Sequence, residues 1–139
     1  MPIRYGMTTE LTALAWGCVL AFVHVFLAVQ VKTRQYGTGW NLGSRDEELP
    51  PARPLVGRLA RAQANFFETF PVMVAAVLIV SAAGLNDRWT AIGALLWLAA
   101  RALYLPLYAF GVRYLRSLAW TAALVGIVLV LKPALALAF

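Results

Sequence analysis

Four long apolar stretches constrain this chain more than any other feature of its sequence. They cover about residues 10–31, 55–83, 89–110 and 115–137. Each is long enough to cross a bilayer as an α-helix, which takes ~20 residues. Backbone polar groups in lipid must be paired within the chain, so such stretches fold as helices. The sequence therefore predicts an all-α integral membrane protein built as a four-transmembrane-helix bundle.

The composition agrees with a single membrane bundle. The chain has 139 residues, 62% of them hydrophobic, and a mean hydropathy of +0.74. Four spans and their connections fill that length, so residues 1–139 are predicted to form one domain. The first stretch is too long for a signal-peptide core and lacks a cleavage-like site, which predicts a retained helix. The net charge of +6 comes without basic runs interleaved with aromatics, which argues against a nucleic-acid partner.

Two isolated side chains in the first stretch are assigned structural roles. Cys18 is the single cysteine, so it has no intrachain disulfide partner, and we expect it to be a small buried apolar residue. His24 lies in the middle of the stretch and has no cysteine or carboxylate nearby in the sequence. We expect a hydrogen-bonded packing residue there and predict no metal site in the chain.

Basic residues are divided unevenly between the two ends of the predicted bundle. The first-to-second and third-to-fourth connections share one side of the membrane and carry Lys32, Arg34, Arg45, Arg53, Arg58, Arg113 and Arg116. The other side carries Arg4, Arg88 and Lys132. Basic residues are enriched in cytoplasmic loops. The sequence therefore predicts that both connections face the cytoplasm, with the termini outside, in a bacterial inner membrane or an endoplasmic-reticulum-type membrane.

The second apolar stretch begins with polar side chains on one helix face. Arg58, Arg61, Asn65 and Glu68 follow the spacing i, i+3, i+7, i+10, which places them within a narrow arc of a helix. Ionisable groups at membrane depth are costly and normally pair with one another or line a polar cavity. The face is either a structural polar cluster that ties helices together or a site for a small ligand with carboxylates, which paired arginines bind bidentately.

The third and fourth stretches add two more sets of polar residues. In the third, Arg101, Tyr104 and Tyr108 are spaced i, i+3, i+7 and so share one face. The fourth opens with basic residues and a serine, at Arg113, Arg116 and Ser117. In a bundle with short connections, these sets are expected to meet at the cytoplasmic half.

These residues together resemble one protein family. The pattern Arg61-Ala-Gln63-x-Asn65-x-x-Glu68-x-x-Pro71, then Arg101-x-x-Tyr104-x-x-x-Tyr108 and arginines opening the fourth stretch, is similar to that of the membrane-associated proteins in eicosanoid and glutathione metabolism (MAPEG). Members include microsomal glutathione transferases, leukotriene and prostaglandin E synthases, and a non-catalytic lipid-binding protein that activates lipoxygenase. The resemblance covers essentially the whole chain in length, number of spans and placement of connections.

The resemblance implies a homotrimer with three glutathione sites between neighbouring subunits. It implies that glutathione is held by Arg61, Asn65 and Glu68 of one subunit, in a pocket to which the third stretch contributes Arg101, Tyr104 and Tyr108. The neighbouring subunit contributes Gln63 and a basic residue from the end of its first stretch, Lys32 or Arg34. The arginine that activates the thiolate is Arg116, paired with Ser117, or its competitor Arg113.

The chemistry of these side chains agrees with that ligand. Glutathione has two carboxylates for arginines to bind, an ammonium for Glu68 and a thiol of pKa ~8.5, which a nearby guanidinium favours as the reactive thiolate. The predicted function is a glutathione-dependent transferase or peroxidase that acts on lipophilic electrophiles or lipid hydroperoxides arriving through the bilayer. The alternatives are a non-catalytic membrane module that binds a lipid or a partner protein, and a small transporter subunit, although no span has the paired Gly/Pro breaks of transporters.

Two features depart from the family pattern. Thr69 stands where the leukotriene synthase has an aromatic hydroxyl, so the glutamyl end of glutathione is expected to be held differently. The glycine- and proline-rich connection of residues 35–57 does not match the mammalian enzymes, and its contribution is left open. The sequence also leaves open whether glutathione or another low-molecular-weight thiol is the ligand.

Overall fold

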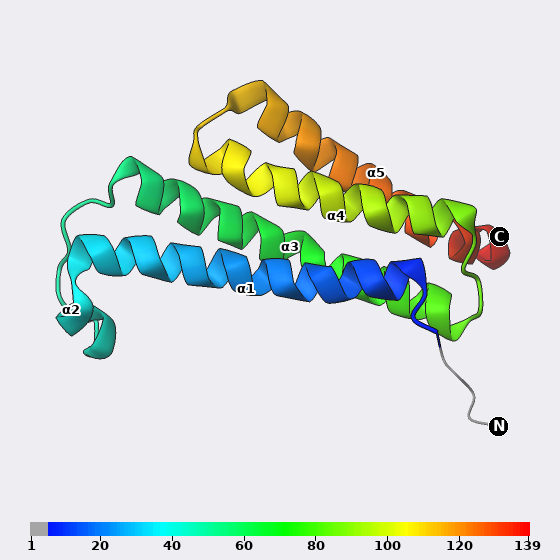
Figure 1. Ribbon diagram of the computed structural model, residues 1–139, viewed down its shortest axis with the longest axis horizontal. Helices are drawn as coiled ribbons and strands as arrows, with labels where there is room; N and C mark the ends of the chain where they lie inside the picture. The colour runs from blue at the N-terminus through cyan, green and yellow to red at the C-terminus, as the bar shows by residue number, and fades with distance from the viewer. Residues whose placement is uncertain (1–5) are drawn as a thin grey trace.

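The computed structural model describes residues 6–139 as four long α-helices and one short one (Figure 1). The helices are α1 (Thr9–Tyr36), α2 (Thr38–Leu42), α3 (Pro54–Ala82), α4 (Arg88–Ala109) and α5 (Arg113–Ala138). The four long helices are long and apolar enough to cross a membrane. This confirms the predicted all-α membrane bundle. Arg4, which the sequence assigns to the side of the membrane with the termini, lies outside the described residues.

The long helices run antiparallel in chain order, so the bundle has two distinct ends. Helix α1 begins and α5 ends at the right of Figure 1, whereas α2 and the turn between α4 and α5 lie together at the left. The two connections rich in basic residues therefore share one end of the bundle, as the sequence predicts.

Hydrogen bonds at the opposite end fix where α1 and α4 begin. Thr8 caps α1 by accepting a hydrogen bond from the backbone of Leu11 at 3.2 Å. Asp87 and Thr90 form a reciprocal capping box at the start of α4, with both bonds at 2.8 Å. The buried Thr90 hydroxyl also donates to the Glu10 carboxylate, which is itself buried. These bonds satisfy free backbone groups and join the first turns of α1 and α4.

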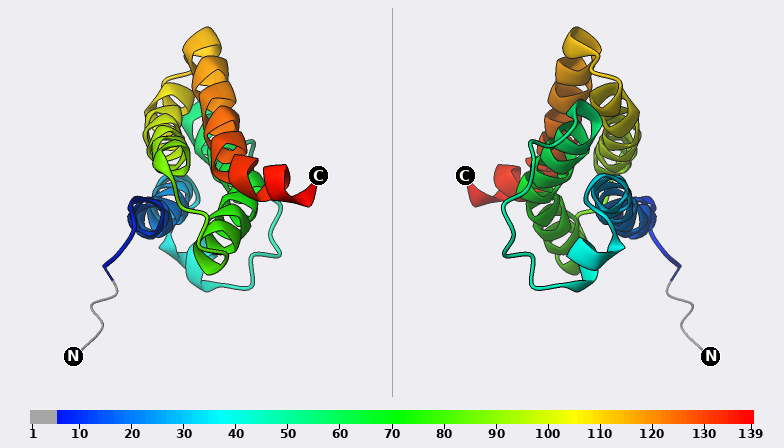
Figure 2. Two further views of the ribbon diagram at one scale, coloured as in Figure 1. Left: turned by 90° about the vertical axis from the view of Figure 1, so that its right-hand side faces the viewer. Right: turned by 90° about the vertical axis from the view of Figure 1, so that its left-hand side faces the viewer.

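Close packing sets the order of the helices across the bundle. Helix α1 packs on α3 and α4, and α5 packs on α4 and α3, so that α3 and α4 lie between α1 and α5 (Figure 2). A Cβ placed on Gly93 of α4 would lie 2.6 Å from the carbonyl oxygen of Gly126 in α5, and the reverse distance is the same. Only glycine allows two backbones to approach this closely, as small residues do between membrane helices.

Large apolar side chains remain on the outside of the subunit. Phe22 and Phe26 of α1 are 77% and 62% exposed, and Leu118 of α5 is 66% exposed. Such surfaces suit lipid or another subunit rather than water. The surface therefore agrees with a chain embedded in a membrane. Cys18 of α1 is exposed as well, so its predicted burial is wrong, because its side chain lies on the outer side of α1.

His24 is a packing residue, but without the expected hydrogen bond. It is 1% exposed, and its ring stacks on Phe66 with centroids 4.6 Å apart. Within residues 6–139, neither ring nitrogen has a hydrogen-bond partner. The packing role is confirmed, and the hydrogen-bonded part of that prediction is wrong for the described chain, because aromatic stacking holds the ring instead.

The connection predicted as residues 35–57 is shorter than expected and contains a helix. Helix α1 continues to Tyr36, α2 follows, and α3 begins at Pro54. Gln35 donates from Nε2 to the carbonyl of Pro51 at 2.9 Å and accepts from the Arg53 backbone at 2.8 Å. The Tyr36 hydroxyl donates to the carbonyl of Pro50 at 2.8 Å. These bonds hold the connection against the end of α1.

Candidate functional site

The polar faces predicted on the second and third spans meet each other between α3 and α4. Arg61 donates from Nε to the Tyr108 hydroxyl at 3.2 Å, and Arg101 donates from Nη1 to the Asn65 side-chain oxygen at 3.0 Å. One turn earlier in α3, Arg58 donates from Nη1 to the carbonyl of Ala109 at 3.3 Å. The structure therefore brings these residues together, with arginines from both helices pairing with polar groups of the other.

Arg101 is buried between α3 and α4, behind the residues that line the site. Its side chain is fully buried, with the guanidinium carbon 4.6 Å from the Tyr104 ring centroid and 5.3 Å from that of Phe66. Stacking on aromatic faces partly offsets the cost of burying a cation. Because Asn65 accepts from Arg101 through its oxygen, its amide nitrogen is directed elsewhere. Arg101 therefore orients Asn65.

Two adjoining hollows open between α3, α4 and α5, and we call them together the α3–α5 cleft. One has a volume of about 420 Å³ and is lined by Asn65, Tyr104, Tyr108, Arg116, Ser117, Trp120 and Thr121. The other, of about 390 Å³, is lined by Arg58, Arg61, Tyr108, Gly111, Arg113, Tyr114, Arg116 and Ser117. Volumes of this size are ordinary for small-molecule sites.

Arg116 and Arg113 differ in their place within the cleft. Arg116 is half-buried, lines both hollows and lies with its guanidinium carbon 4.5 Å from the Tyr108 ring centroid. Arg113 is exposed and lines only the outer hollow. Ser117 lines both hollows, although its hydroxyl hydrogen-bonds the Arg113 carbonyl at 3.3 Å. Of these two arginines of α5, Arg116 is therefore the one that lies next to Tyr108.

The cleft carries positive charge. Four arginines line it, and within the described residues no carboxylate does. Glu68 continues the polar face of α3 but is exposed and makes no hydrogen bond inside residues 6–139. In the same part of the chain, no group of three metal-ligating side chains is present. The arrangement is suited to an anionic organic ligand.

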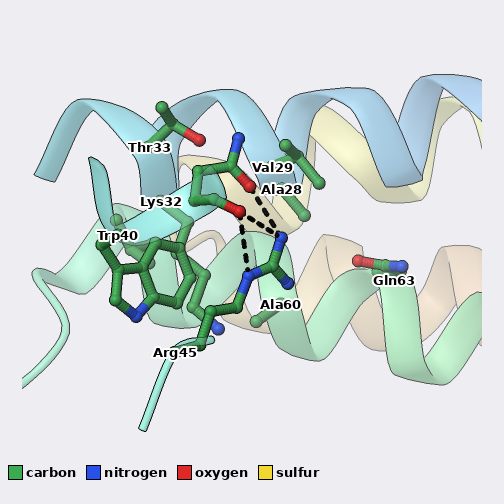
Figure 3. Close-up of a pocket in the computed structure, with 10 residues that line it drawn as sticks. Ala28, Val29, Lys32, Thr33, Trp40, Arg45, Ala60 and Gln63 are labelled. Atoms are coloured by element: carbon green, nitrogen blue, oxygen red, sulfur yellow. Dashed lines mark hydrogen bonds between the residues drawn. The ribbon is translucent and has the colours of Figure 1, made fainter. Parts of the chain in front are cut away.

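The remaining predicted binding residues lie on a different face of the subunit. Lys32 and Gln63 line a cavity of about 160 Å³ between α1 and α3, beside Trp40 and Arg45 (Figure 3). Gln63 is two residues from both Arg61 and Asn65, and so points ~200° away from them around the helix. Arg34 is exposed and lines neither the cavity nor the cleft. One subunit therefore does not bring all the predicted site residues together.

Sequence reasoning missed several residues that line these spaces. Trp120 and Thr121 follow Arg116 and Ser117 by four residues, so helical spacing could have found them. The cavity residues Thr33, Trp40, Asn41 and Arg45 come from the end of α1 and from a connection without periodicity, which gave no such signal.

Comparison with known proteins agrees with this architecture. The family model described as the MAPEG family matches residues 13–136. No curated protein and no solved structure matches the chain. MAPEG members are four-helix membrane bundles, which is the fold observed. Because the match spans nearly the whole of that bundle, the chain belongs to the MAPEG family.

Proposed function

We propose that this protein is a glutathione-dependent transferase or peroxidase that acts on lipophilic electrophiles or lipid hydroperoxides. Members of the MAPEG family generally use glutathione, and their activities belong to glutathione or eicosanoid metabolism at membranes. One observation carries the proposal for this chain: the α3–α5 cleft gathers arginines, an amide and three tyrosines from three helices, without a carboxylate among the described residues that line it.

The residues of the cleft match the groups of glutathione. Arg61, already oriented by Tyr108, binds one of the carboxylates of the ligand. Asn65, whose oxygen is occupied by Arg101, offers its amide nitrogen to a peptide carbonyl. Glu68 is free of partners in the described chain and accepts the ammonium group. Each of these side chains then gains a partner that the subunit alone does not provide.

Arg116 activates the sulfur in this proposal. A guanidinium within ~4–6 Å of a thiol favours the thiolate, which is the nucleophile. With an electrophile, the thiolate forms a carbon–sulfur bond as the leaving group departs with its electron pair. With a hydroperoxide, it attacks the O–O bond, releases the alcohol after proton transfer and becomes a sulfenic acid. A second glutathione then reduces the sulfenic acid to a disulfide and water.

The site is completed by a neighbouring subunit in a homotrimer. MAPEG members are generally oligomeric. Lys32 and Gln63 lie together on the α1–α3 face, away from the cleft, so a second copy is needed to bring them to the ligand. Closing that face on the cleft of the next subunit also covers exposed apolar side chains such as Phe22. Membrane lipids surround the trimer, and the lipophilic substrate reaches a cytoplasm-facing site through the bilayer.

Calorimetric titration of the purified protein with glutathione tests the proposal, followed by a conjugation assay with a generic aryl halide. We expect binding in the micromolar-to-millimolar range, a new ultraviolet thiolate absorbance on binding, and turnover. Glu68→Gln and Arg61→Ala are expected to weaken binding strongly, since each leaves a charge of the ligand unpaired. A parent protein that binds glutathione without thiolate or turnover would favour the non-catalytic module, and one that does not bind it would refute the proposal.

A further inference from the structure

Arg45 lies in the connection that departs from the family pattern, yet it shares a cavity with Lys32 and Gln63 (Figure 3). We propose that Arg45 is a further binding residue, which binds a carboxylate of the glutathione held in the α3–α5 cleft of the neighbouring subunit. The inference rests on the proposed function. It adds Arg45, from the loop that follows α2, to the residues that the neighbouring subunit contributes to the site.

The backbone of Arg45 adopts a conformation that side chains other than glycine rarely take. Its φ is +63°, and within residues 6–139 it is the single non-glycine residue with a positive φ. Such a conformation costs energy and persists where surrounding contacts hold it, which is frequently at ligand sites. The conformation directs the Arg45 side chain back over α2, toward the space between α1 and α3.

The guanidinium of Arg45 is fixed in place before any ligand arrives. It donates to the Asn41 carbonyl from Nε at 3.3 Å and from Nη2 at 3.0 Å, and Nη2 also donates to the Asn41 side-chain oxygen at 2.7 Å (Figure 3). Its carbon lies 5.1 Å from the Trp40 ring centroid. In the described chain, Nη1 has no partner. A preorganised cation with a free donor loses little freedom on binding an anion.

A second cation lies against the same indole ring. The ammonium of Lys32 is 5.2 Å from the centroid of Trp40, and Trp40 itself is 9% exposed and packs on Tyr36. Two positive groups held at one ring repel each other unless an anion lies between them. No carboxylate lines the cavity within the described residues. An anionic group of a ligand in the cavity would therefore interact favourably with both cations.

The size and depth of the cavity favour one end of glutathione over a lipid headgroup. Its volume of about 160 Å³ is below the ~300 Å³ of whole small-molecule pockets, so it suits a terminal group. Gln63 lies nine residues after the start of α3, which is roughly 13 Å along the helix axis. Asn65 of the cleft lies two residues further along α3, so the inner end of the cavity comes within one helical turn of the level of the proposed ligand.

The test compares carboxylate variants of the ligand in the full-length protein in lipid nanodiscs. We measure the affinity of glutathione and of its two monoesters, each with one carboxylate blocked, for the parent and for Arg45→Gln. We expect Arg45→Gln to weaken glutathione roughly 10- to 100-fold, as for the loss of a charged hydrogen bond. It should leave unchanged the affinity of one ester, the one whose blocked carboxylate is the group that Arg45 binds.

Two further variants separate binding from structure. Arg53→Gln removes an arginine of the same connection that lines neither this cavity nor the α3–α5 cleft, and the variant should bind glutathione within about two-fold of the parent. Asn41→Ala keeps the charge of Arg45 and its bonds to the backbone carbonyl but removes the bond from Nη2 to the Asn41 side chain, and it should cause a smaller loss than Arg45→Gln. Size-exclusion chromatography and thermal unfolding check that each variant keeps the parent's assembly.

The outcomes distinguish this inference from the proposed function. If the parent does not bind glutathione, the proposed function fails and the role of Arg45 fails with it. If the parent binds and Arg45→Gln binds equally well, the role of Arg45 alone is overturned. An equal loss for glutathione and both esters would overturn it in favour of a general charge effect. Unchanged glutathione affinity with loss of co-purified anionic phospholipid would assign the cavity to a lipid headgroup instead.

Discussion

Replacing Arg116 with alanine should change the pH dependence of the reaction more than its ligand affinity. The guanidinium of Arg116 is half-buried beside Tyr108 and borders both hollows of the cleft. At ~5 Å from a thiolate and an effective dielectric constant of ~20, its attraction is about 3 kcal/mol. That energy corresponds to about two pKa units, so the pKa of the thiol of bound glutathione would fall from ~8.5 to ~6.5.

The sign of the effect follows from the charge of the thiolate. In the parent, activity should rise with pH through ~6.5, whereas in Arg116→Ala it should rise through ~8.5. At pH 7 the loss of thiolate reduces turnover ~25-fold, and the two proteins converge above about pH 9. Glutathione affinity should stay within a few-fold, because in the proposed site Arg61 and its neighbours bind the carboxylates.

Stopped-flow conjugation rates and ultraviolet thiolate absorbance across pH provide the measurement, with Arg113→Ala as the matched control. Arg113 is exposed and borders only the outer hollow, so its removal should leave the pH profile in place. The reasoning is refuted if Arg116→Ala keeps the profile of the parent, or if Arg113→Ala shifts it instead.

Three further predictions address assembly, packing and topology. In mixed trimers of Arg116→Ala and Arg45→Gln subunits, random mixing should place an intact cleft against an intact α1–α3 cavity at ~25% of sites, and these sites should recover activity and affinity. If no sites recover, the whole site lies within one subunit. Gly126→Ala should lower the thermal unfolding temperature of the detergent-solubilised protein, at a cost of about 1–3 kcal/mol, because the added Cβ would lie 2.6 Å from a backbone oxygen; an unchanged temperature would mean that α4 and α5 separate freely. Single cysteines at Gly43 and Asn86, in a chain without Cys18, should be labelled from opposite sides of the membrane, and labelling from the same side would rule out the four-span topology.

The helices and their polar faces could be predicted because they follow from periodicity. An apolar stretch of membrane length folds as an α-helix in lipid, because only the helix pairs all its backbone polar groups within one segment. The spacing of Arg101, Tyr104 and Tyr108 then places them on one helix face, whatever packs against it. The ends of helices were less predictable. Helix α1 continues to Tyr36, beyond the apolar stretch and the predicted end at Lys32 and Arg34, whose side chains reach the membrane surface.

The candidate site was only partly predictable, since much of it depends on tertiary packing. The α3 positions could be assigned from the sequence, and 100° per residue already places Gln63 opposite Asn65. The burial of Arg101 could not, because it depends on the Phe66 and Tyr104 rings that enclose it. The position of the Arg45 side chain could not be predicted either, because its orientation depends on a positive φ outside any helix. Sequence patterns describe a helix face, and they give no information on how an irregular connection folds back.

The distribution of charge leads to a last prediction, on the stability of the assembly. The α3–α5 cleft and the α1–α3 cavity are both lined by cations and, among the described residues, by no carboxylate. Closing one on the other in the proposed trimer would bring like charges together, and the two carboxylates of glutathione would offset that repulsion. The ligand should therefore stabilise the trimer, by about 2.7 kcal/mol at a concentration 100-fold above its dissociation constant. Subunit dissociation on heating, followed by native mass spectrometry with and without glutathione, measures this. Glutathione diethyl ester lacks both free carboxylates and should stabilise far less; equal stabilisation by the ester would show that the carboxylates do not lie between the two surfaces.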